Sequence, residues 1–116
     1  MFNLFKKKKK EINLVFNNNE IDSICLILHN ELERFEQLTT LERKDSDVYL
    51  VVKRYYNFLN GKEVAIVPLD SKDREDLLIL LALIMRVADK VEDSTEKNWL
   101  YSIAARIQWV HRGLGE

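Results

Sequence analysis

The chain has 116 residues, the length of a single domain, with 18 Lys and Arg against 19 Asp and Glu. Its 47% hydrophobic residues exclude a disordered chain, and its 3 Gly and 1 Pro exclude a turn-rich all-β sandwich. The formal net charge of -1 excludes a protein that coats nucleic acid through bulk electrostatic attraction.

Cysteine content and apolar runs indicate the compartment. Cys25 is the single cysteine, so an internal disulfide is excluded and we expect a reducing environment. The longest apolar run, Leu77–Met85, has nine residues, whereas a bilayer span needs about 20. The N-terminal charges follow a very short apolar segment, which is the reverse of the order in a secretory signal. We therefore expect a cytoplasmic protein.

The first predicted elements are a strand over residues 12–16 and a helix over residues 18–42. The strand segment is short and mostly apolar, and three asparagines interrupt it. Asn17 and Glu20 have the spacing of a helix capping box. Apolar residues then recur at steps of three and four along one helix face: Ile21, Ile24, Cys25, Leu28, Leu32, Phe35 and Leu38.

Residues 48–60 allow two interpretations. Their β-branched and aromatic residues, followed by Asn60-Gly61, would suit a hairpin strand and a two-residue turn. Gly61 would alternatively be the left-handed residue that ends a helix. We favour the helix, with Lys53 and Arg54 on its outer face, because apolar residues repeat at helical spacing: Val48, Val51, Val52, Tyr55, Phe58 and Leu59.

A second strand is predicted over residues 63–68. Pro68 cannot donate a hydrogen bond to a strand ladder, so it should either close this strand or lie at a sheet edge. Asp70 or Ser71 is then placed to cap the next helix.

Two more helices complete the chain. The body of the first, residues 77–91, is apolar nearly all round, and such a helix lies either in the centre of a core or in a subunit interface. Ser94 is predicted to cap the last helix, which we expect over residues 99–110.

These elements predict a small α+β fold, mostly helical, with about four helices and a two-stranded β ribbon. Residues 1–10 form a basic tail, and residues 11–116 form the single domain. The order strand, helix, helix occurs twice, and residues 16–37 align with residues 69–90 at a constant offset of 53. Duplication of a βαα unit is therefore one interpretation, although amphipathic helices resemble one another in any case. Two strands alone are marginal in water, so helices must cover the ribbon or a second copy must extend it.

The residue types that carry chemistry are sparse. His29 lacks the second histidine of a helical zinc site, and we interpret it as a partly exposed histidine beside Glu33. His111 suits the negative end of its helix, and Cys25 is interpreted as a small hydrophobic residue. We expect no catalytic residues, no metal and no cofactor, and therefore no enzyme. A metal-assisted enzyme using His29 and neighbouring acids is the least favoured alternative.

The basic tail is the most conspicuous local feature. Phe2, Leu4 and Phe5 precede five consecutive lysines: Lys6, Lys7, Lys8, Lys9 and Lys10. Each lysine near an anionic membrane could contribute about 1 kcal/mol, and the same cluster could bind phosphates of nucleic acid. The plainer interpretation is a solubilising tail before an edge strand. Binding to an anionic surface is thus the alternative function.

Aromatic residues suggest protein interaction. The chain has more large aromatic residues than one modest core buries comfortably, and such residues often anchor interfaces, although core packing explains most of them. The interface candidates are Tyr49, Tyr56, Trp99, Tyr101 and Trp109. Together with the all-round apolar helix, they predict a non-enzymatic interaction module that self-associates and regulates, inhibits or scaffolds a protein partner.

Overall fold

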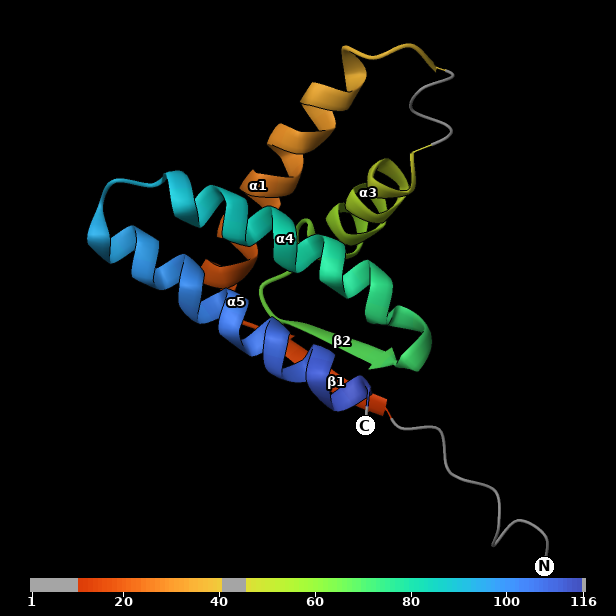
Figure 1. Cartoon of the computed structure of the whole chain (residues 1–116), viewed down its shortest axis with the longest axis vertical. Helices are drawn as coiled ribbons and strands as arrows, with labels where there is room; N and C mark the ends of the chain where they lie inside the picture. The colour runs from red at the N-terminus through yellow and green to blue at the C-terminus, as the bar shows by residue number, and fades with distance from the viewer. Residues whose placement is uncertain (1–10, 41–45, 116) are drawn as a thin grey trace, which may run out of the picture.

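The computed structural model describes residues 11–40 and 46–115 and has the predicted α+β fold. In this part of the chain, helices pack against one face of a two-stranded antiparallel sheet (Figure 1). The basic tail, residues 1–10, lies outside the described residues. The elements in chain order are β1 (Glu11–Phe16), α1 (Asn18–Glu36), α3 (Asp47–Leu59), β2 (Ala65–Asp70), the 3-10 helix η2 (Ser71–Asp73), α4 (Arg74–Lys90) and α5 (Ser94–Leu114).

The two strands form a ribbon with one buried and one exposed face. Leu14 lies opposite Val67 with both side chains buried, whereas Val15 lies opposite Ile66 with both exposed. This alternation follows from the period of two along a strand. The helix α5 runs beside β1, where Arg106 donates a hydrogen bond to the Val15 carbonyl at 3.0 Å.

The strand β2 extends to Asp70, so the predicted range of residues 63–68 is wrong at both ends. Pro68 lies inside the strand, opposite Asn13, and its side chain is exposed. Both strands of a two-stranded sheet are edge strands, and an edge tolerates a proline, which has no N–H to donate. Pro68 therefore lies at a sheet edge, the second of the two positions expected for it.

The helix α1 begins as predicted and ends earlier than predicted. The Asn17 side chain accepts from the Glu20 N–H at 2.9 Å, and the Glu20 carboxylate accepts from the Asn17 N–H at 2.9 Å. The last helical residue is Glu36 rather than residue 42. The Leu38 N–H bonds to the Phe35 carbonyl three residues back, which tightens the end of the helix. Leu38 is 40% exposed and is not part of the hydrophobic core of the described residues, although it continues the apolar pattern.

The ambiguous segment is the helix α3, as favoured. Ser46 caps its first turn by accepting from the Tyr49 N–H at 3.2 Å. Gly61 follows its end with φ of +84°, the left-handed conformation expected after a helix. The helix therefore replaces the hairpin that Asn60-Gly61 would otherwise suit.

The helices α4 and α5 form an antiparallel pair joined by residues 91–93. Asp70 caps η2, which leads into α4. The side chain that caps α5 is Asp93 rather than Ser94, and α5 is longer than the predicted residues 99–110. The two strands pair as a duplicated βαα unit would require, but the duplication itself stays a prediction.

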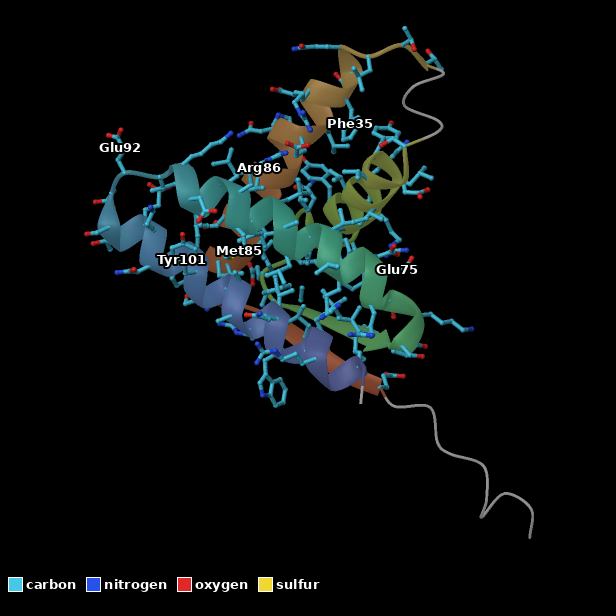
Figure 2. All side chains as sticks on the ribbon, in the orientation of Figure 1. Phe35, Glu75, Met85, Arg86, Glu92 and Tyr101 are labelled. Atoms are coloured by element: carbon cyan, nitrogen blue, oxygen red, sulfur yellow. The ribbon has the colours of Figure 1, made fainter. Side chains whose placement is uncertain are left out.

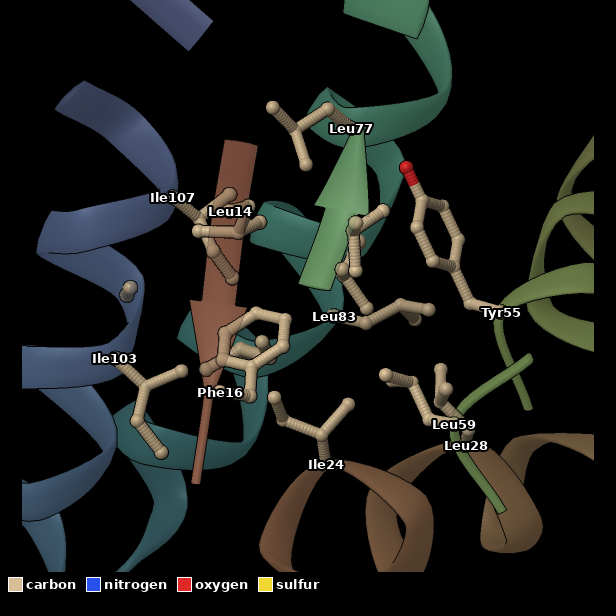
Figure 3. Packing of buried hydrophobic residues seen from close by; sticks show 14 of the residues in the cluster. Leu14, Phe16, Ile24, Leu28, Tyr55, Leu59, Leu77, Leu83, Ile103 and Ile107 are labelled. Atoms are coloured by element: carbon tan, nitrogen blue, oxygen red, sulfur yellow. The ribbon is translucent and has the colours of Figure 1, made fainter. Parts of the chain in front are cut away.

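Among the described residues, a hydrophobic core lies between the buried face of the ribbon and the helices (Figure 3). Phe16 and Leu14 extend from β1 toward Ile103 and Ile107 of α5. Ile24 enters from α1 on another side of the same core. The ribbon is therefore stabilised by the helices that cover it.

Candidate interaction surface on helix α4

One face of α4 is apolar and uncovered. Leu77, Leu80 and Ile84 point into the core, as expected for a helix packed on a sheet. On the opposite face Leu78 is 49% exposed, Met85 is 37% exposed, and Ala82 between them is also exposed. The helix is thus not central in the core, and the described residues leave this face without a partner.

A basic cluster lies at one end of this face. Glu31 of α1 is buried and accepts hydrogen bonds from Arg34 at 2.7 Å and from Arg86 of α4. Lys90 lines the same cavity of about 300 Å³ as these residues. Three cations therefore surround one carboxylate, which leaves an excess of positive charge.

An acidic cluster lies at the other end, between α3 and α4. A cavity of about 450 Å³ there is lined by Asp47, Glu75 and Asp76 together with Arg54. The Arg54 guanidinium pairs with Asp76 at 2.6 Å, which leaves two carboxylates without a cation among the residues that line the cavity. Figure 2 shows Glu75 near this end of α4 and Arg86 toward the other.

Apolar side chains connect the two clusters. A groove of about 360 Å³ between α1, α3 and α4 has an apolar floor made by Phe35, Val48, Ile79, Ala82 and Leu83. Ile79 lines both this groove and the acidic cavity. We call Leu78, Ile79, Ala82 and Met85, with the charged cluster at each end, the α4 surface.

The interface candidates from the sequence do not gather at one place. Four of them are partly buried and contact other residues of the same chain. The ring of Tyr49 packs edge-on against Phe35 at 5.4 Å between centroids, and Tyr56 lies 6.1 Å from the His29 ring.

The two tryptophans and Tyr101 lie on α5. Trp99 donates to the Ser23 hydroxyl at 3.1 Å, and Tyr101 donates to Asp89. Trp109 is 70% exposed. Sequence reasoning pointed to α4 as a whole but missed its individual surface residues, because a helix that is apolar all round does not reveal which face the core leaves free.

The residues considered as catalytic or metal-binding candidates do not form a common site among the described residues. His29 pairs with Glu33 at 2.9 Å, and both are exposed on α1, as expected. Burial and the nearby Asp22 raise the pKa of the Cys25 thiol, which keeps it protonated. Within residues 11–40 and 46–115, no three metal-ligating side chains come together.

The described helices include none that is both long enough and apolar enough to cross a bilayer. Comparisons of the chain with family models, with curated proteins and with solved structures find no match.

Proposed function

We propose that this protein is a non-enzymatic interaction module that self-associates through the α4 surface and acts on a protein partner as a regulator or scaffold. The observation that carries the proposal is the uncovered apolar face of α4. A contiguous apolar surface with a polar rim is typical of a site of protein association. Burial of exposed leucine and methionine side chains against a second surface removes them from water and is therefore favourable for association.

Charge complementarity favours a second copy as the occupant. Most soluble homo-oligomers have two-fold symmetry, in which one surface packs against itself. A two-fold axis near Ala82 would place the acidic cluster of each copy against the basic cluster of the other. Asp89 also lies at the basic end, where its carboxylate accepts a hydrogen bond from the Tyr101 hydroxyl and keeps its negative charge, so the excess of positive charge there is smaller than the three cations alone would give. The small side chain of Ala82 would allow two helices to approach closely.

Charge reversal tests this arrangement. Glu75→Lys and Lys90→Glu should each weaken the dimer about tenfold, which corresponds to about 1.4 kcal/mol, because like charges then face each other twice per dimer. The double variant restores opposite charges and should recover most of the affinity. The dissociation constant is measured by sedimentation velocity over a concentration series.

The controls separate a specific effect from loss of folding. Val64→Glu places a new charge at an exposed apolar residue outside the α4 surface and should leave the dimer intact. Circular dichroism should show the same helix content for every variant. Additive weakening in the double variant would exclude the two-fold arrangement.

A further inference from the structure

Trp109 is the most exposed large apolar side chain of the described residues. It lies on α5 and is 70% exposed. Two contacts place this part of α5 beside β1. Arg106 donates to the Val15 carbonyl at 3.0 Å, and a Cβ atom added at Gly113 would meet the Ile12 side chain at 2.7 Å. Trp109 lies between these two contacts along the helix, so α5 presents an uncovered indole ring alongside the ribbon.

The outer face of the ribbon adds aliphatic side chains. Val15 and Ile66 lie opposite each other and are 46% and 57% exposed, and Pro68 is exposed on the same face. Because side chains alternate along a strand, these three point away from the core. We call Val15, Ile66 and Pro68, together with Trp109, the ribbon surface.

Positive charge is concentrated at one end of the ribbon surface. The five lysines, Lys6–Lys10, precede Glu11 directly in the sequence, so they join the described chain where β1 begins. Figure 1 shows the end of α5 beside this point. The exposed Arg112 of α5 adds a cation near this end, whereas Glu11 and Asp70, which lie opposite each other on the ribbon, add two carboxylates. The lysines outnumber these acids, so the net charge at this end is positive.

Exposed apolar side chains beside a cluster of cations match the surface of an anionic membrane. Tryptophan is enriched at membrane interfaces because its ring is amphipathic. Burial of valine and isoleucine side chains at the boundary of the acyl chains is favourable, and stable attachment usually combines such an apolar contact with a second signal such as a basic patch. A nucleic acid would satisfy the lysines through its phosphates but would leave the aliphatic side chains without an apolar partner.

We propose that the ribbon surface and the five lysines bind the surface of an anionic membrane, with the Trp109 ring at the level of the lipid headgroups. This activity is separate from the proposed self-association, because no residue of the ribbon surface belongs to the α4 surface.

Co-sedimentation of the full chain with lipid vesicles tests the charge requirement. Wild type should bind vesicles of equal parts phosphatidylserine and phosphatidylcholine, and should bind vesicles of phosphatidylcholine alone at least about tenfold more weakly. Lys8→Gln should weaken binding to the anionic vesicles about fivefold, the contribution of one lysine near such a surface. Lys53→Gln removes an exposed lysine of α3 and should leave this binding unchanged.

Trp109→Ser tests the part played by the described structure. The variant should weaken binding to the anionic vesicles about tenfold, because a large side chain no longer leaves water on binding. Leu26→Ser, at a leucine of α1 that is 62% exposed, should leave it unchanged. Vesicles should also shift the tryptophan emission of wild type to shorter wavelength but not that of Trp109→Ser, in which Trp99 remains bonded to Ser23. Circular dichroism should show the same helix content for all variants.

Absence of binding to the anionic vesicles would overturn the proposal, and binding of the chain to single-stranded RNA in that case would assign the lysines to nucleic acid instead. Equal binding to the two kinds of vesicle, or wild-type affinity of either Lys8→Gln or Trp109→Ser, would overturn it as well.

Discussion

Two buried glutamates connect α1 to the helix pair α4 and α5. Glu20 and Glu31 are the buried charged residues of the described chain. Arg106 of α5 donates to Glu20 at 2.8 Å, and Arg86 of α4 donates to Glu31. Glu20 also accepts from the N–H of Asn17, the cap of α1, and Glu31 accepts from Arg34 of α1, so neither buried charge is left unpaired. Removing one partner of such a pair is costly because the other charge stays buried.

Glu20→Gln tests this connection. Burial alone would raise the pKa of Glu20, but Arg106 and the Asn17 N–H outweigh burial and hold the pKa below its ordinary value. We expect the variant to lower the free energy of unfolding at pH 7 by roughly 1.5–3 kcal/mol, the range for hydrogen bonds to charged groups. Urea denaturation measures this change.

The pH dependence of the same variant has a defined sign. A carboxyl whose pKa is lower in the folded state contributes stability above its unfolded pKa and loses it as pH falls through the folded pKa. The difference between wild type and Glu20→Gln should therefore shrink between about pH 6 and pH 3. Glu33→Gln, at an exposed carboxylate of the same helix, should change stability by less than about 0.5 kcal/mol. A difference that stays constant down to pH 3 would argue against this role for Glu20.

Among the elements, the end of α3 depends on one glycine. Gly61 has φ of +84°, and a Cβ atom added there would meet no atom within 4 Å. Gly61→Ala should therefore cost about 1–2 kcal/mol through backbone conformation alone. Gly61→Asn should cost less, because asparagine tolerates the left-handed region better. Thermal unfolding of both variants measures the loss of stability. An equal loss for Gly61→Ala and Gly61→Asn would contradict this account.

Local signals explain which elements were predictable. The start of α1 followed from Asn17 and Glu20, because a capping box is made by residues close in sequence. The ends of α1 and β2 were missed because they depend on distant contacts. Leu38 continues the helical pattern but lies outside the hydrophobic core of the described residues, and the register with β1 keeps Leu69 and Asp70 in the strand.

The α4 surface shows the same difference between local signals, which the sequence reveals, and contacts between distant elements, which it does not. The apolar character of α4 was evident from the sequence, but the exposure of Leu78 and Met85 depends on which sides α1, α3 and α5 cover. The juxtaposition of Arg34 with Arg86 brings together residues of two helices that no spacing rule connects.

At the scale of the whole molecule, the proposed self-association uses helices rather than the ribbon, although Val15 and Ile66 are exposed on the outer face of the ribbon. Helices bury the inner face of the ribbon, and α5 lies along β1. Strand addition at β2 is disfavoured because Pro68 lacks an N–H. We therefore propose the α4 surface, with its complementary charged ends, as the contact with a second copy.

The molar mass of the chain in solution tests the central claim most directly. If the proposed two-fold contact through the α4 surface forms, sedimentation equilibrium of wild type should give twice the mass of one chain. Ala82→Arg, which places a long charged side chain at the centre of that contact, should give the mass of one chain with unchanged helix content. A wild type that stays monomeric at all concentrations, or a dimer that Ala82→Arg leaves intact, would contradict the account.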